Sequence, residues 1–283
     1  AWSRQGFPFH QAYLDAVVAH FDATVQELDF TSPAAVPTIN QWASDHTNGL
    51  IPMVLEEIGD EVLFLINALY FKGDWTTRFK KGDTAPGTFH LGDGTEVSVP
   101  TMSGTIPSVG FRWLEGGGAV GELPYGGQVF GFTVVLPGNH ETVDDLLAEL
   151  DDATWAEWTG QLLYEKVSVR LPSFEIEWAD SLAPALKAMG MEVAFDEELA
   201  DFSLMSPRDD LFLSRVDQKV CMRVDEEGTE AAAVTTTGTA PTSGPPSLTV
   251  DRPFLLAIRE RLTGTVLFLG VIRDPRAESG SHS

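Results

Sequence analysis

Residues 220–248 read VCMRVDEEGTEAAAVTTTGTAPTSGPPSL, and this stretch decides the prediction of the fold. Its first six residues alternate, with Val220, Met222 and Val224 on one side, which is the period-2 pattern of a β-strand. After Gly228 the alternation continues on a face of small, uncharged side chains: Thr229, Ala231, Ala233, Thr235 and Thr237. The glycines and prolines of residues 238–246 then disfavour any further strand.

Two interpretations of this stretch are open. A run of Thr, Ala, Gly and Pro is typical of a surface loop. However, an irregular loop of this length is uncommon in a compact domain and tends to be functional. The small side chains on one face of its first half could enter a β-sheet without burying a charge. We therefore predict a loop that is able to become a strand.

Three motifs resemble one known family. The hinge motif EEGTEAAAV closely resembles the start of the reactive-centre loop of serpins, and the sequence that follows the loop, PFLLAIRERLTGTVLFLGVIRDP, fits the same family, as does INALYFKGDW upstream. Together these motifs span almost the whole chain. The resemblance implies an inhibitory serpin of bacterial type, with an α+β serpin fold. This fold has mixed β-sheets, surrounding helices and an exposed reactive-centre loop, here residues 226–247.

Composition narrows the class of protein. The chain has 283 residues, of which 43% are hydrophobic, so a sizeable core is possible within a single domain over residues 1–283. The formal net charge of −24 would repel nucleic acid and anionic membranes over most of the surface. Cys221 is the only cysteine and the six histidines have no metal-ligand spacing, so we expect no disulfide, no metal and no cofactor. We expect a monomer.

The residues at the two ends of the sequence lead to further predictions. The first residues, AWSRQGFPFH, are no signal peptide and resemble a strand from the interior of a serpin domain. We therefore expect the N-terminal helices of the domain to be absent from this sequence, and both a secreted and a cytoplasmic location fit it. The polar residues 276–283 are predicted to be a disordered tail.

Hydrophobic periodicity predicts the remaining elements. Helices are predicted at residues 8–21, 36–48, 141–150 and 154–163, and from residue 182 to a stop at Gly190. Strands are predicted at residues 25–30, 62–71, 129–136, 167–171, 254–260 and 265–272, and a hairpin within residues 89–102.

The resemblance also assigns roles to single residues. The hinge comprises Gly228, Thr229, Glu230, Ala231, Ala232, Ala233 and Val234. The region where the main sheet opens includes Asn67, with Gln218 where the family usually has a His, and Trp75 under the point of loop insertion. Glu226 precedes the hinge, and its usual Lys partner is here Ser173, so we expect that ion pair to be missing.

The reactive bond follows from counting along the family pattern. Counting from Glu226, and back from Pro253, places the cleaved bond between Thr242 and Ser243. The implied partner is a serine protease, and a small uncharged Thr242 favours elastase-like, subtilisin-like or chymotrypsin-like enzymes. A non-inhibitory serpin that is cleaved as a simple substrate remains an alternative. A hydrolase of unrelated fold is another, although the sequence contains neither a G-x-S-x-G motif nor a P-loop.

Overall fold

The computed structural model describes residues 2–21, 25–64, 66, 73–214, 216–227 and 244–276. These residues form two compact units. The first unit consists of the described parts of residues 1–70 and 177–222, and the second of those of residues 71–176 and 223–278. The assignment of residues 1–283 to a single domain stays a prediction.

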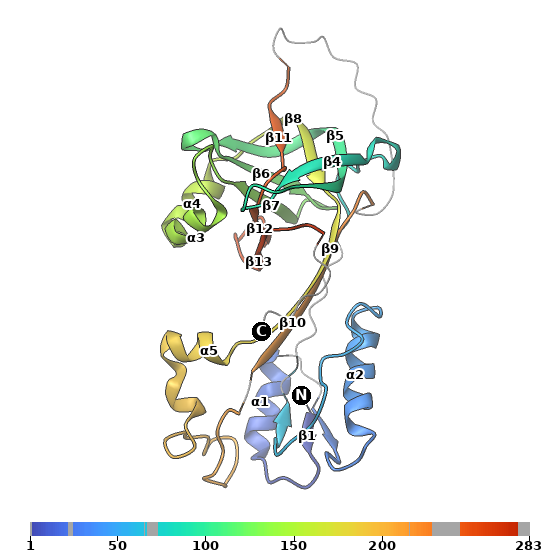
Figure 1. Cartoon of the computed structure of the whole chain (residues 1–283). Helices are drawn as coiled ribbons and strands as arrows, with labels where there is room; N and C mark the ends of the chain where they lie inside the picture. The colour runs from blue at the N-terminus through green and yellow to red at the C-terminus, as the bar shows by residue number, and fades with distance from the viewer. Residues whose placement is uncertain are drawn as a thin grey trace. The chain divides into compact units, whose positions relative to one another are not determined.

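A three-stranded sheet lies at the centre of the first unit. Its middle strand, β1 (Trp2–Arg4), is parallel to β2 (Gln26–Leu28) and antiparallel to β3 (Leu63–Phe64). The helices of this part are α1 (Gln11–Phe21) and α2 (Ala35–His46) (Figure 1). A cluster of buried apolar side chains joins the sheet to α2: Trp2, Phe30, Ile39, Leu55 and Phe64.

The rest of the first unit follows the strand β9 (Phe174–Ser181). This strand pairs with β10 (Asp217–Val224) in a two-stranded sheet, and the division between the units falls within both strands. Between them lie α5 (Ala183–Leu186) and two single turns, Lys187–Met191 and Glu192–Phe195. The helix predicted to run to Gly190 is shorter in the structure, because α5 ends at Leu186; Gly190, with a φ of 97° that glycine adopts without strain, interrupts the helical backbone inside the turn that follows.

An eight-stranded sheet dominates the second unit. In spatial order its strands are β11 (Ser247–Thr249), β8 (Leu163–Pro172), β5 (Glu96–Trp113), β6 (Ala119–Pro124), β7 (Phe130–Leu136), β12 (Phe254–Glu260) and β13 (Val266–Ile272), with β4 (Ala85–His90) paired to β5. Every residue of β6 is buried, and β7 is buried after its first residue. Strands covered in this way read as continuous apolar runs, which explains the sequence VFGFTVVL.

Two short helices pack on this sheet. They are α3 (Val143–Glu149) and α4 (Asp152–Gly160), which lie side by side in Figure 1. Val143, Leu146 and Trp158 from these helices bury themselves against Val120, Val135 and Leu255 of the sheet. Each helix begins at a capping side chain: Thr142 forms a reciprocal capping box with Asp145, and Asp151 accepts a bond from the Thr154 amide.

Most other predicted elements are confirmed, with three differences. The helix predicted at residues 154–163 ends at Gly160, because Leu163 already pairs with Phe111 in the sheet. Cys221 and Met222 fall on opposite faces of the predicted strand at residues 220–225, yet both are buried. Of the strand predicted at residues 62–71, the structure describes only Val62, β3 and Ile66, so the remainder lies outside the described residues.

A buried carboxylate ties five segments of the second unit together. The Glu122 side chain on β6 is fully buried, and its Oε2 accepts from Arg259 Nε at 2.5 Å and from the Thr133 hydroxyl at 3.1 Å. Its Oε1 accepts from Arg261 Nε at 3.0 Å and from the Tyr164 hydroxyl. Burial, followed by the bond to Glu122, raises the pKa of Tyr164. Paired and fully hydrogen-bonded, this charge can be buried without a net penalty.

Glu122→Gln tests how much this network contributes to the free energy of unfolding. The amide keeps the shape of the side chain but leaves the buried Arg259 and the partly buried Arg261 without their counter-charge. We expect a loss of about 3–5 kcal/mol in the free energy of unfolding, the cost of breaking a buried ion pair. Urea unfolding measures it, with the exposed Glu149→Gln as a control that should stay within about 0.5 kcal/mol of the parent. Equal unfolding midpoints for Glu122→Gln and the parent would show that the network carries no stability.

Candidate functional site

The candidate site is the segment between β10 and β11, together with the residues that hold its two ends. Residues 228–243 lie outside the described part of the chain. They contain the whole predicted hinge, Gly228 to Val234, and the predicted reactive bond Thr242–Ser243. The flanks are described, and each is fixed by contacts within the second unit.

The N-terminal flank is held by an aromatic cluster. Trp75 is 4% exposed, and its indole Nε1 donates a 2.8 Å hydrogen bond to the carbonyl oxygen of Asp225, directly after β10. The ring stacks on Tyr125 at 4.6 Å between centroids and meets Phe132 and Phe79 edge-on. The indole is therefore rigid, and so is the backbone position that it binds. The role of Trp75 beneath the point of loop insertion stays a prediction.

Three consecutive carboxylates form what we call the acidic anchor, Asp225-Glu226-Glu227. The Asp225 carboxylate accepts from the Glu227 backbone amide at 2.9 Å and pairs with Arg223 at 3.0 Å. Glu226 accepts a 2.5 Å hydrogen bond from the Thr84 hydroxyl, and Glu227 pairs with Lys81. Each carboxylate of the anchor thus has its own partner, and two of these partners come from the short segment before β4.

The ion pair between Lys81 and Glu227 shifts the pKa values of both side chains away from neutral pH. The bond to Lys81, then its charge, lowers the pKa of Glu227, and the reciprocal contact raises the pKa of Lys81. The stabilisation is therefore present at neutral pH. It is lost as the pH falls through the lowered pKa of Glu227, or rises through the raised pKa of Lys81. Both side chains are more than half exposed, so the pair is weak and salt-sensitive.

The C-terminal flank enters the large sheet. Ser168 donates its backbone amide to the Pro246 carbonyl at 2.9 Å, and β11 continues parallel to β8 with Leu248 opposite Val169. Leu248 is fully buried. It packs over Gly121, where an added Cβ would lie 2.2 Å from a Leu248 methyl group, so a larger residue at 121 would displace the Leu248 side chain. This end of the segment is held by both a backbone ladder and a buried side chain.

The predicted site residues divide between the two units. Trp75 and Glu226 meet at the acidic anchor, whereas the exposed Gln218 belongs to the first unit and Asn67 lies outside the described residues. Ser173, at the position where the resemblance implies a Lys, donates its backbone amide to the Pro100 carbonyl. Sequence reasoning missed the substitutes, Thr84 and Lys81. The signal was present, because an acidic triplet needs donors and KKGDT follows Trp75 closely.

The described residues hold no cluster of His, Cys, Asp and Glu that could bind a metal ion. None of the helices among them has the length and apolar character of a membrane span.

Comparison with known proteins decides the family. The serpin (serine protease inhibitor) family profile matches residues 1–275. The chain belongs to the serpin family. Neuroserpin from Gallus gallus is 33% identical over 292 residues, covering 98% of this chain and 70% of that protein. Plasminogen activator inhibitor 1 from Neovison vison is 35% identical over 266 residues, covering 90% and 66%.

A solved serpin has the same fold. The structure of thyroxine-binding globulin in complex with thyroxine superimposes with a TM-score of 0.84 at 26% identity, covering 98% of this chain and 74% of that one. The predicted α+β serpin fold is therefore confirmed, and the alternative of a hydrolase of unrelated fold is wrong. The serpin family consists of serine protease inhibitors and not of catalytic enzymes. Membership therefore indicates a serine protease as the partner, without specifying its type.

Thr84→Val tests the acidic anchor. The substitution removes the hydroxyl that Glu226 accepts from and keeps the side-chain volume. A hydrogen bond to a charged group contributes about 1.5–3 kcal/mol, so amide exchange at residues 223–227 should accelerate roughly tenfold or more. Thr84→Ser keeps the hydroxyl and should exchange like the parent. Identical exchange in Thr84→Val and Thr84→Ser would mean that this bond does not hold the flank.

Proposed function

We propose that this serpin inhibits serine proteases as a suicide substrate: the protease cuts its loop, and the loop inserts into a β-sheet before the acyl-enzyme is hydrolysed. One observation carries the proposal. Both flanks of the loop are held by contacts within the second unit, and the sequence between them has the alternation of a strand. Between the acidic anchor and Pro246, the first half of the segment alternates small uncharged residues on one face. Such a face can be buried in a sheet without stranding a charge.

Insertion has a favourable free energy. The reactive segment gains roughly 0.5–1.5 kcal/mol for each backbone hydrogen bond that it forms as a strand. About a dozen such bonds, with packing of the small face, outweigh the cost of ordering the freed segment. Strand addition by a serpin loop is an established form of this process. The uncut state must then be metastable and persist because its conversion is slow.

The length of the segment explains the trapping. Fourteen residue steps separate Gly228 from Thr242, which at ~3.3 Å per step carries the attached protease about 46 Å. The protease serine first attacks the Thr242 carbonyl and forms an ester, and the amine of Ser243 leaves. Displacement over this distance would distort the protease active site before water can cleave the ester. Insertion must therefore be faster than deacylation.

The site suggests the class of target. Thr242 is small, branched and uncharged, so pockets that require Arg or Lys are disfavoured and elastase-like, subtilisin-like or chymotrypsin-like pockets are favoured. Pro241 restricts the backbone just before the cut bond. We further propose that the protein acts as a monomer, without a cofactor and away from nucleic acid and membranes, in keeping with its net charge of −24.

The alternative is a serpin that is cleaved but does not inhibit. One observation favours keeping it: the structural relative described above has the same fold and binds thyroxine, so the fold by itself does not establish inhibition. The small uncharged face of residues 229–237 argues for the inhibitor, since a loop that never inserts has no need of it.

A panel of serine proteases separates these functions. The inhibitor should give a complex that survives denaturing electrophoresis with at least one elastase-like, subtilisin-like or chymotrypsin-like enzyme. Mass spectrometry of the released C-terminal fragment should begin at Ser243. A clean cut without a complex would support the non-inhibitory alternative, and a fragment beginning elsewhere would move the reactive bond.

Thr229→Arg tests the hinge. Thr229 is the first inward residue of the inserting strand, and an uncompensated guanidinium there costs several kcal/mol to bury. Insertion would slow while the bond at Thr242 is still cut, so the chain should change from inhibitor to substrate. The number of inhibitor molecules consumed per protease silenced should rise about tenfold or more.

Glu230→Arg is the matched control for this variant. It places the same guanidinium on the next residue, whose side chain stays in solvent, and should leave the stoichiometry close to that of the parent. Efficient trapping by Thr229→Arg would refute the hinge assignment.

A further inference from the structure

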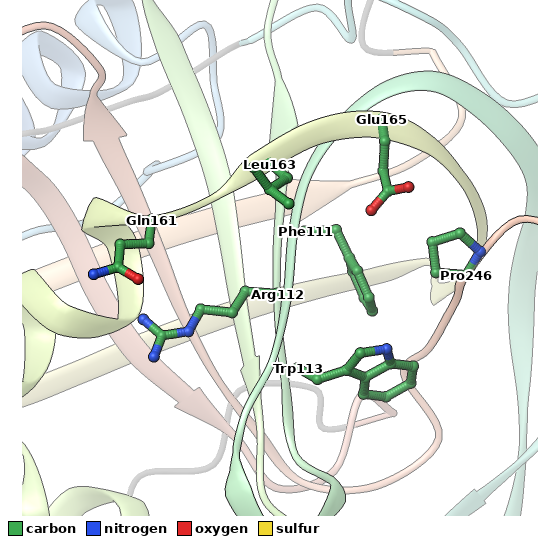
Figure 2. Close-up of a pocket in the computed structure, with 7 residues that line it drawn as sticks. All are labelled: Phe111, Arg112, Trp113, Gln161, Leu163, Glu165 and Pro246. Carbon is green, nitrogen blue, oxygen red and sulfur yellow. The ribbon is translucent and has the colours of Figure 1, made fainter.

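A shallow apolar pocket lies next to the C-terminal flank of the loop. It has a volume of about 210 Å³ and is lined by Phe111, Arg112, Trp113, Gln161, Leu163, Glu165 and Pro246 (Figure 2). Phe111 and Leu163 form a cross-strand pair between β5 and β8, and the Trp113 ring stands edge-on to Phe111 at 5.0 Å between centroids. The structure therefore presents a built apolar surface, which we call the flank pocket.

The flank pocket is unusually exposed for its composition. Leu163 is 71% exposed and Trp113 is 58% exposed, although both are large apolar side chains. Apolar side chains that gather on a surface and are surrounded by polar residues mark a site of protein–protein contact. The buried Phe111 beneath them gives the surface a firm base.

The position of Pro246 ties this pocket to the loop. Pro246 is held by the Ser168 amide and stands three residues after Ser243. Covalent geometry limits the Cα separation of Ser243 and Pro246 to roughly 11 Å, whatever path the chain takes between them. A protease bound at Thr242–Ser243 must therefore lie close to the flank pocket.

Protease–inhibitor contacts of standard size bury about 800 Å² on each partner, spread over twenty to thirty residues a side. A contact of that size includes residues beside the loop as well as those that enter the active-site cleft. On the side of Ser243, the flank pocket is an apolar surface within reach.

The charged residues of the flank pocket indicate which side chains of a partner it would bind. Arg112 is already neutralised, because it donates to the Glu157 carboxylate at 3.0 Å and to the Glu157 carbonyl at 2.5 Å. Glu165 projects an exposed carboxylate at the rim, and among the described residues it makes no ion pair. An apolar side chain beside a Lys or Arg would satisfy both features.

We propose that the flank pocket is a second docking surface for the target protease, which inserts an apolar side chain of a surface loop over Leu163 and Trp113 and places a neighbouring basic residue against Glu165. This proposal rests on the proposed function. It adds a contact that selects among proteases whose active-site pockets accept the same Thr242.

The test measures binding without chemistry. The probe is the panel protease that cuts the parent chain fastest, with its catalytic serine replaced by alanine. Leu163→Ser should weaken its Kd about tenfold, the loss expected for one central side chain of an interface. Glu165→Lys should also weaken binding and should reduce its dependence on salt. Leu262→Ser, at a leucine in the turn after β12 that is 89% exposed, is the matched control and should bind like the parent.

The outcomes separate this proposal from the proposed function. Equal Kd values for the parent, Leu163→Ser and Glu165→Lys would overturn the docking surface even if the parent forms a covalent complex. A parent that is cut without forming a complex would refute inhibition, while the Kd series would still decide the docking surface. If the parent self-associates in sedimentation, and Leu163→Ser abolishes this while leaving the protease Kd unchanged, the pocket binds a second copy and the proposal fails. A parent that no panel protease cuts would overturn both.

Discussion

The hydrogen bond from the Trp75 indole to the Asp225 carbonyl fixes the point at which strand ends and loop begins. The ring that donates it is clamped by Tyr125, Phe132 and Phe79, so the bond is placed by the aromatic core of the second unit. Beyond this point, the hold on the chain comes from side-chain contacts of Glu226 and Glu227 with Thr84 and Lys81. The contacts on the chain thus change from a buried one at Asp225, through a partly buried one at Glu226, to an exposed and weak one at Glu227. This gradient suits a segment that has to be held until it is cut and then leave.

Two carboxylates of the second unit, Glu122 and Glu227, differ sharply in burial. Glu122 is fully buried and bonded by four side chains from different strands and turns, which makes the sheet that receives β11 rigid. Glu227 meets Lys81 in solvent, where the pair contributes little and responds to salt and pH. In the proposed mechanism, the C-terminal flank stays in place while the N-terminal flank releases its exposed contacts and inserts.

The sequence predicted the fold and most elements because their signals are local. Runs such as VFGFTVVL and the alternation at residues 220–225 report burial directly, and EEGTEAAAV carries the family resemblance. The partners of the acidic anchor were missed because they are set by tertiary contact: Thr84 and Lys81 lie about 140 residues before Glu226 and Glu227. The helix predicted to run to residue 163 was too long for a similar reason, since pairing with Phe111 draws Leu163 into β8. The flank pocket arises from β5, β8 and Pro246 together, and no single stretch of sequence announces it.

The most direct test of this account is the thermal stability of the chain before and after its loop is cut at Thr242–Ser243. If the freed segment inserts as a strand, about a dozen new backbone hydrogen bonds form, and Tm should rise by roughly 20 °C or more. Differential scanning calorimetry of the intact and the cleaved protein, compared at the same concentration and pH, measures this change. A Tm that stays the same or falls after the cut would contradict insertion, and with it the mechanism that the loop sequence supports.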